Sequence, residues 1–298
     1  MTILAQPRPS VRSPWDRIRY RSGRLVLYVI VLTLCTMFGF PIFWTLMSSL
    51  KTPQEMFAYP PVIIPETFRW ENYYQVLVIP RIPVQRWALN STIIVVLGTI
   101  GTVVTASLVA YSFARFEYRG RNLLFIITLS TLMLPAQVTL IPQFVLFYNF
   151  GWVNTLLPLW VPLWFGGGAF AIFLMRQFLM TLPRDLDEAA LIDGAGYFRI
   201  FWEILLPLCK PILATLSIIT LIDLWSDFLG PLIYLNSPEK FTVSVGLQFF
   251  NATPEVGGDP MQHLLMAACV LSMIPVIVIF FLGQRFFVQG IVMSGIKG

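Results

Sequence analysis

Long apolar stretches separated by short polar ones constrain this sequence more than any other feature. Hydrophobic residues make up 57% of the 298 residues and charged residues only 12%, whereas a soluble domain carries roughly 25% charged residues. Each helical crossing of a bilayer needs about 20 apolar residues, so the length accommodates six or seven crossings and no large soluble domain. We therefore predict an all-α membrane protein with six transmembrane helices, at approximately residues 25–49, 89–113, 123–147, 156–180, 208–234 and 264–282.

The positive charges predict the orientation of these helices. With six spans, both termini lie on one side of the membrane, and fifteen of the twenty Lys and Arg residues lie on that side. Such an excess marks the cytoplasmic side. We therefore expect cytoplasmic tails at 1–24 and 287–298, a six-helix domain at 25–286 and a cytoplasmic loop at 182–207. The first apolar run is too long for a cleavable signal peptide, so we expect a retained anchor.

The sequence has no pattern typical of a catalytic or metal centre. The three cysteines are isolated, the chain has one histidine, and no GxxxxGK[ST] phosphate loop occurs. We expect the cysteines Cys35, Cys209 and Cys269 to be small core residues. The chain is therefore expected to bind no cofactor, to have no enzymatic activity of its own and to bind no nucleic acid.

The polar segment 182–207 separates two predicted spans. Pro183 and Asp185 predict the start of a helix, with Glu188 completing a capping box, and Gly194 predicts its end. A face with two alanines is expected to be thin; it is formed by Leu186, Ala189, Ala190 and Asp193. A second amphipathic helix is expected to turn four apolar residues toward the membrane: Phe198, Phe201, Trp202 and Leu205. The residues alone leave two interpretations open, a loop that transmits motion from a partner and a simple connection between spans.

Two aspartates lie in the predicted span 208–234. A carboxylate near the bilayer centre costs about 2.5–3.5 kcal/mol, and Asp223 and Asp227, four residues apart, would share a helix face with Trp225 close by. Such a face either lines a water-filled pathway, with or without direct contact to a sugar, or has a structural role: it makes helix–helix hydrogen bonds or lies close enough to the outer surface to be wet. Both interpretations remain open.

Two other features also have two interpretations. Prolines interrupt the predicted spans 123–147 and 156–180, either as ordinary kinks or as points where helices flex. The loop 51–87 is rich in prolines and aromatic residues, and is either a docking surface for an outside partner or a cap on the helices.

The polar segment resembles a known family motif. Glu188-Ala189-Ala190, followed by Gly194 and then by Ile204, Leu206 and Pro207, resembles the EAA motif of permease subunits of bacterial ABC importers. Asp193-Gly194-Ala195 is similar to the DGA form of that motif. Further segments resemble the carbohydrate-uptake branch, and within it the smaller permease of the maltose and glycerol-3-phosphate transporter type: SLKTPQEMF, NSTIIV, AYSFARFEYRGR, FLMRQF, DFLGPLIY and RFFVQGIVMSGIKG.

This resemblance implies a fold, an assembly and a location. The fold would be that of a type I ABC-importer permease in a bacterial or archaeal plasma membrane. The partners would be membrane lipid, a second permease, two ATPase subunits that use ATP and Mg²⁺, and an extracytoplasmic solute-binding protein. The chain would form half of the translocation pathway of a sugar importer.

The resemblance also implies roles for individual residues. The motif helix would seat in a groove of the ATPase, with Glu188 pairing to basic groups and Gly194 supplying the turn. The implied coupling residues are Glu188, Ala189, Ala190, Asp193, Gly194, Ala195, Ile204 and Pro207. The C-terminal residues implied to reach the ATPase are Ser294, Gly295, Lys297 and Gly298. The implied pathway residues are Asp223, Trp225 and Asp227. Gly196 departs from the family, which often has a serine-like cap there.

Two other functional classes fit the residues less well. A secondary transporter predicts paired internal repeats and ion-coupling acids in several spans, whereas only the span 208–234 has such acids. A membrane enzyme requires a cluster of acid, base and nucleophile, which the sequence lacks. The transported sugar is not specified by the sequence.

Overall fold

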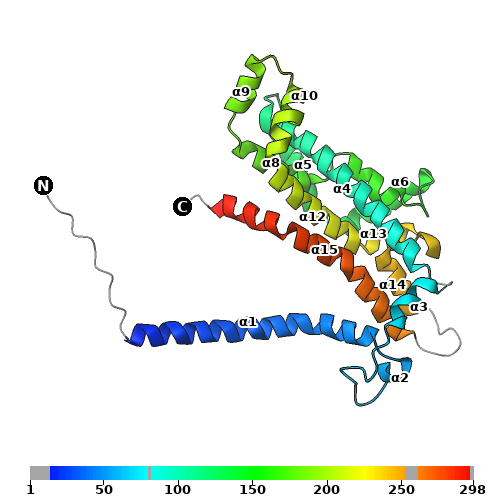
Figure 1. The fold of residues 1–298 in the computed structure, drawn as a ribbon. Helices are drawn as coiled ribbons and strands as arrows, with labels where there is room; N and C mark the ends of the chain where they lie inside the picture. Colours follow the sequence, from blue (N-terminus) through cyan, green and yellow to red (C-terminus); the bar gives the residue numbers. More distant parts are fainter. Residues whose placement is uncertain (1–13, 80–81, 253–260, 296–298) are drawn as a thin grey trace.

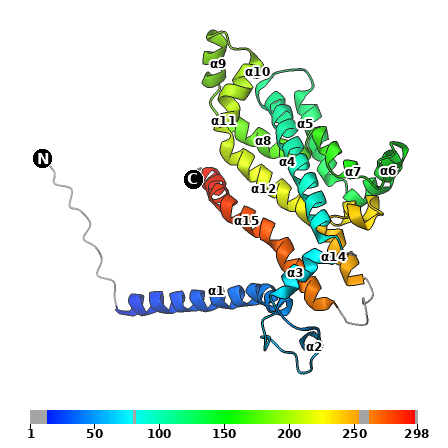
Figure 2. The same cartoon turned by 45° about the vertical axis from the view of Figure 1, so that its right-hand side comes forward.

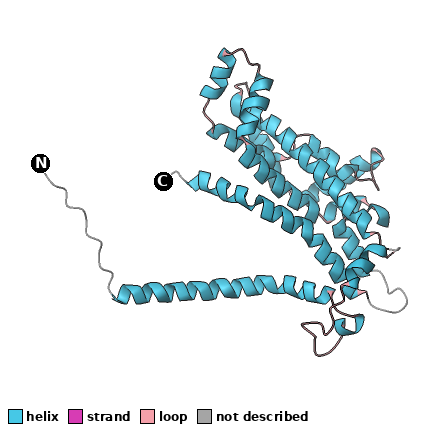
Figure 3. Ribbon diagram, viewed as in Figure 1, coloured by secondary structure: helices cyan, strands magenta, loops and turns pink. Residues whose placement is uncertain are grey.

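The computed structural model describes residues 14–79, 82–252 and 261–295, and within these ranges every regular element is a helix (Figure 3). The first elements are α1 (Pro14–Ser49), α2 (Pro53–Met56), α3 (Glu71–Val78) and α4 (Val84–Arg115). The middle of the chain forms α5 (Arg121–Ser130), η1 (Thr131–Met133), α6 (Ala136–Asn149), α7 (Leu157–Trp160), η2 (Val161–Trp164) and α8 (Ala169–Thr181). The rest forms α9 (Asp185–Ile192), α10 (Tyr197–Arg199), η3 (Ile200–Leu205), α11 (Leu206–Leu208), α12 (Lys210–Ser226), α13 (Leu229–Tyr234), η4 (Pro238–Lys240), α14 (Val243–Ala252) and α15 (Gln262–Gly295). The predicted all-α class is confirmed.

Four helical segments are long and apolar enough to cross a membrane: Gly23–Ser49, Val84–Arg115, Leu157–Thr181 and Gln262–Gln284. Two bent pairs pass the same test when each is counted as one span. They are Arg121–Met133 with Gln137–Asn149, bent by 100°, and Tyr197–Leu208 with Lys210–Ser226, bent by 78°. The described residues therefore supply four to six candidate spans.

The helices at both ends of the chain extend beyond the predicted spans. α1 begins at Pro14, inside the predicted basic tail, because proline suits the first turn of a helix and arginine is a good helix former. α15 continues to Gly295, inside the predicted tail 287–298, and no proline follows Pro275 to stop it.

The predicted segment 208–234 is not one continuous helix. α12 ends at Ser226, the backbone is extended at Asp227, and α13 begins at Leu229. The predicted segment 123–147 is also interrupted. There the interruption falls at Pro135, one of the two prolines already expected to interrupt it, which has extended backbone angles and precedes α6.

α4 is the central helix, packed against α8 and α12. Small residues allow this close approach. A Cβ added at Gly98 would lie 2.6 Å from the Leu224 side chain of α12, and one added at Gly101 would lie 2.5 Å from the Trp164 ring. Two buried apolar clusters extend from α4, one around Trp87 near its start and one around Ala110 near its end.

α1 diverges from the other helices (Figures 1 and 2). None of the apolar segment of its candidate span is buried in the described chain. Cys35 on α1 is exposed, so the prediction that it is a core residue is wrong. Hydrogen bonds hold its C-terminal end. The Asn72 amide donates to the carbonyl oxygens of Ser49 (2.8 Å) and Lys51 (2.9 Å), and Lys51 Nζ lies 4.2 Å from the centre of the Trp44 ring. α1 is therefore fixed at one end and free of this chain along most of its length.

The two ends of the bundle carry different elements. α9 and α10 lie at one end, and α2, α3 and α14 lie at the other (Figures 1 and 2). The loop between α1 and α4 partly covers the helices, since Asn72 and Val76 are buried, while Tyr59, Trp70 and Tyr74 are exposed. The structure is therefore consistent with both interpretations of this loop, a docking surface for an outside partner and a cap on the helices.

Candidate coupling loop and pathway residues

The loop at the α9 end begins with a short acidic helix. Arg184 caps α9, and its carbonyl oxygen accepts hydrogen bonds from the backbone N–H groups of Asp187 (2.9 Å) and Glu188 (3.1 Å). The predicted capping box is wrong. Because Arg184 already has helical backbone angles, Asp185 lies inside the helix and makes no cap. The three acids in the first turn still interact favourably with the helix dipole: Asp185, Asp187 and Glu188.

The predicted end of this helix is confirmed. Gly194 has φ +82°, its N–H donates to Leu191 O (3.0 Å), and the Ala195 N–H donates to Ala190 O (2.9 Å). These two bonds form the Schellman motif, whose left-handed position suits glycine. Gly196, by contrast, is extended and caps α10 without a side chain.

The two sides of α9 have different environments. Ala190 is only 7% exposed and packs in the apolar cluster at the end of α4, whereas Glu188, Ala189 and Asp193 are exposed. Ile192 is 86% exposed, which is unusual for an isoleucine at the end of a short polar helix. The predicted thin face is therefore divided: Ala190 packs against this chain, and Ala189 is exposed.

The segment 197–208, which leads from α9 back to the bundle and is called the returning arm here, also has a buried and an exposed side. Phe201 and Leu205 are buried, while Phe198 and Trp202 are exposed and stack with ring centres 6.2 Å apart. Each pair is four residues apart and occupies its own stripe of the helix. The prediction that all four face the membrane is wrong, because one stripe packs under α4, where the Phe201 and Tyr111 ring centres are 5.0 Å apart.

The remaining motif residues lie where the loop returns to the bundle. Ile204 is half-buried against the cluster at the end of α4. Pro207 lies in α11, directly after the π-helical turn η3, and the chain then bends by 78° into α12.

A buried ion pair joins α9 to α4. Arg115 Nε lies 3.0 Å from Asp187 Oδ2, and the two side chains are 6% and 17% exposed. Arg115 Nη2 also donates to Leu182 O (3.1 Å), just before α9. Burial raises the pKa of Asp187, and the positive charges of Arg115 and Arg184 oppose this. From the sequence, Arg115 is predicted only to be a cytoplasmic charge, and no role is predicted for Asp187.

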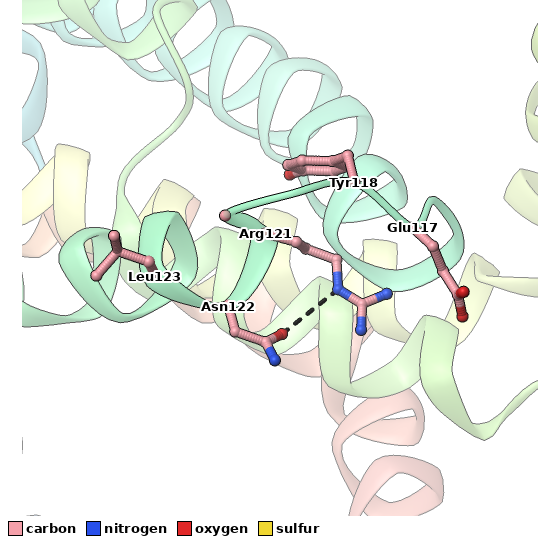
Figure 4. A pocket seen from close by; sticks show the side chains of 6 residues that line it. Glu117, Tyr118, Arg121, Asn122 and Leu123 are labelled. Atoms are coloured by element: carbon pink, nitrogen blue, oxygen red, sulfur yellow. Dashed lines mark hydrogen bonds between the residues drawn. The ribbon is translucent and has the colours of Figure 1, made fainter.

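Weaker contacts surround this pair. Tyr111 Oη donates to Tyr197 O (3.2 Å) on the returning arm. Arg184 Nη1 lies 3.3 Å from Glu117 Oε1, but these side chains are 55% and 73% exposed. The turn that carries Glu117 also lines a shallow pocket, in which Arg121 donates to Asn122 Oδ1 (3.4 Å; Figure 4).

The predicted pathway residues do not all lie together. Asp223 and Asp227 line one shallow depression, but the break after Ser226 means that they do not share a helix face. Asp227 Oδ1 accepts a hydrogen bond from the Gly230 N–H (3.3 Å), at the start of α13. Trp225 instead packs toward α15, donating from Nε1 to Ser272 O (3.2 Å), and lines a second pocket of about 390 Å³.

The predicted C-terminal contact lies at the edge of what the structure describes. Ser294 and Gly295 are the last residues of α15, whereas Lys297 and Gly298 lie outside the described residues. Within the described ranges, no group of three His, Cys, Asp or Glu side chains is arranged to hold a metal ion.

Comparisons with known proteins agree with this architecture. Residues 102–293 match the family described as "Binding-protein-dependent transport system inner membrane component". The sn-glycerol-3-phosphate transport system permease protein UgpE of Yersinia pestis is 35% identical over 260 residues, covering 86% of this chain and 91% of the relative. The arabinooligosaccharides transport system permease protein AraQ of Bacillus subtilis is 31% identical over 277 residues, covering 92% and 96%.

A solved structure shares the fold. A chain in the crystal structure of a bacterial ABC transporter involved in the import of the acidic polysaccharide alginate superposes with a TM-score of 0.79. The identity is 24%, over 94% of this chain and 100% of that one. The chain therefore belongs to the family of binding-protein-dependent transport system inner membrane components, and it has the type I ABC-importer permease fold.

Proposed function

We propose that this chain is a membrane-spanning permease subunit of an ATP-driven, binding-protein-dependent sugar importer. The named relatives carry glycerol phosphate and arabinooligosaccharides, and the structural neighbour imports alginate. A second alginate transporter structure contains a periplasmic protein bound to an alginate pentasaccharide, which supports an external binding protein as a partner. The solute is therefore proposed to be a sugar or a polyol phosphate.

The proposed topology has six spans with both termini in the cytoplasm of a bacterial or archaeal cell. The bent pair around Pro135 forms one crossing. α12, with 17 residues, is about 26 Å long and accounts for most of the crossing that follows the loop. The charge distribution supports a cytoplasmic position for α9.

The observation that carries the coupling role is the geometry of α9. Its inner side is held by the Arg115–Asp187 pair and by Ala190, while Glu188, Ala189 and Ile192 are exposed at the end of the molecule. A helix with a fixed base and an exposed carboxylate and alanine suits insertion into a groove of another protein. Two ATPase subunits, which hold ATP and Mg²⁺, are the proposed partners.

The remaining sites follow from the same assembly. The exposed apolar surface of α1 requires lipid or a second permease as cover. Asp223 and Asp227 border the proposed translocation pathway, since both line one depression, and Trp225 lies beside it. The end of α15, including Ser294 and Gly295, is proposed to approach the ATPase.

The test uses the purified complex of permeases, ATPase and binding protein. Glu188→Ala combined with Gly194→Ala should lower binding-protein-stimulated ATP hydrolysis and uptake by about tenfold, because the charge and the turn are both lost. Glu203→Ala changes an exposed carboxylate of the returning arm and is the matched control, with an expected change below about twofold. If the binding protein still stimulates ATP hydrolysis fully in the double variant, the coupling role of α9 is ruled out.

A further inference from the structure

The ion pairs of the loop 182–207 differ in how far they are exposed to water. Three ion pairs lie on it or at its base, and two of them are exposed: Arg184–Glu117 and Arg199–Glu203. Exposed ion pairs contribute little to stability, because water competes with them and both side chains are mobile. The Arg115–Asp187 pair is different, because its side chains are 6% and 17% exposed and the two groups are within 3.0 Å. A buried pair tolerates little displacement, since separating it leaves an unpaired charge.

This pair connects α9 to a helix that is not its neighbour in the chain. The backbone joins the loop to α8 on one side and to α12 on the other, whereas Arg115 is the last residue of α4. Arg115 also holds Leu182 O (3.1 Å), so one guanidinium fixes both the segment before α9 and its first turn. α4 in turn packs closely on α12 and α8 through positions such as Gly98, where a Cβ would approach Leu224 to 2.6 Å.

We propose that Arg115 and Asp187 are positioning residues that make α9 move as one body with α4. Displacement of α9 by a partner then reaches the centre of the bundle directly, in addition to the two flanking helices. Both side chains are mostly covered by this chain, unlike the exposed Glu188 and Ala189. The proposal rests on the coupling role of α9 and adds the route by which its motion enters the spans.

The first test compares transport with ATP hydrolysis in the reconstituted complex. Asp187→Asn keeps the size of the side chain and removes its charge, and should lower the solute transported per ATP hydrolysed by about tenfold. Arg115→Lys keeps the charge but cannot reach both Asp187 and Leu182, so an intermediate loss is expected. Glu117→Gln alters the exposed pair beside it and should stay within about twofold of the unmodified complex.

A double variant separates positioning from mere stability. Arg115→Met with Asp187→Leu replaces the buried pair by apolar groups, which commonly restores stability. We expect normal assembly and thermal stability but a persistent loss of transport per ATP, because the bond to Leu182 is gone. Spin labels at Asp185→Cys and Tyr118→Cys, in a chain without its native cysteines, should give a broader distance distribution in this variant.

The outcomes are distinct. A double variant with restored transport per ATP and an unchanged distance distribution would show that the pair is only structural, and would overturn the proposal. If Glu188→Ala with Gly194→Ala also leaves stimulation intact in the same preparation, the coupling role itself fails. If that variant is uncoupled while Asp187→Asn and Arg115→Lys are normal, only the positioning role fails.

Discussion

At the residue scale, Asp187 combines a charge with burial, and acid should therefore affect function and stability in opposite directions. Burial raises its pKa, the nearby Arg115 and Arg184 oppose the rise, and Glu188 adds to it. As the pH falls through this raised pKa, Asp187 loses its charge and its ion pair, so transport per ATP should fall.

The effect of Asp187 on the free energy of unfolding has the other sign. Because its folded pKa lies above the unfolded value, its contribution to stability is present at low pH and is lost as the pH rises through the folded pKa. Transport per ATP and thermal unfolding are measured together as the pH is lowered from neutrality toward the ordinary aspartate pKa of about 3.9. Asp187→Asn should lack the acid-dependent loss of transport, and a profile of unchanged shape in that variant contradicts the assignment.

Local chemistry decides which single residues the sequence could identify. Gly194 was predicted because a left-handed turn after a helix demands glycine, whatever the rest of the fold does. The Arg115–Asp187 pair was missed because it depends on the meeting of α4 and α9, which no local pattern encodes. The apolar residues of the returning arm were recognised, but which stripe faces the core depends on the position of Tyr111 on α4.

At the element scale, the glycines between η2 and α8 are required for different reasons. Gly166 and Gly167 both have positive φ, at +108° and +68°. Only Gly167 is also packed tightly: an added Cβ would lie 2.5 Å from Thr102 O on α4, whereas one at Gly166 would meet open space. Gly167→Ala should therefore cost about 2–4 kcal/mol and Gly166→Ala about 1–2 kcal/mol. Thermal unfolding of the purified variants tests this order, and equal losses would contradict the close contact with α4.

Pro231 favours the break between α12 and α13 but does not by itself require it, since α1, α6 and α15 continue through Pro41, Pro142 and Pro275. A proline ring clashes with the carbonyl of the residue four positions earlier, which is Asp227, so a helix cannot continue undisturbed across that residue. The apolar pattern, by contrast, continues to Tyr234 and predicts one unbroken span. The long helices α4 and α15 were easier to predict, since their apolar runs are long.

The same break allows the two roles of Asp227 to be separated. Its carboxylate accepts the Gly230 N–H, as a capping side chain does. Asp227→Asn preserves a cap of similar strength and should leave stability nearly unchanged, while Asp227→Ala should lower it by about 1 kcal/mol. If Asp227 also borders the pathway through its charge, both variants should raise the KM for uptake. A normal KM in both variants, with the loss of stability confined to Asp227→Ala, would leave Asp227 a purely structural role.

At the scale of the whole molecule, the two ends of the bundle should lie on opposite sides of the membrane. α9 lies at one end and the loop between α2 and α3 at the other (Figure 1). The sequence predicts this separation through its charges, but it does not predict that α1 diverges, because an apolar run looks the same whether or not other helices of the chain bury it.

This topology predicts the accessibility of two single cysteines, placed in a chain whose three native cysteines are replaced by alanine. Tyr59→Cys lies in the loop between α2 and α3, where Tyr59 is 95% exposed, and Glu188→Cys lies on the exposed side of α9. In right-side-out vesicles, a membrane-impermeant maleimide should label position 59 at once and position 188 only after permeabilisation. Both should react in detergent, which excludes burial as the reason for poor labelling. The reverse pattern would place α9 outside the cell, where no ATPase could reach it, and would rule out the proposed function together with the orientation.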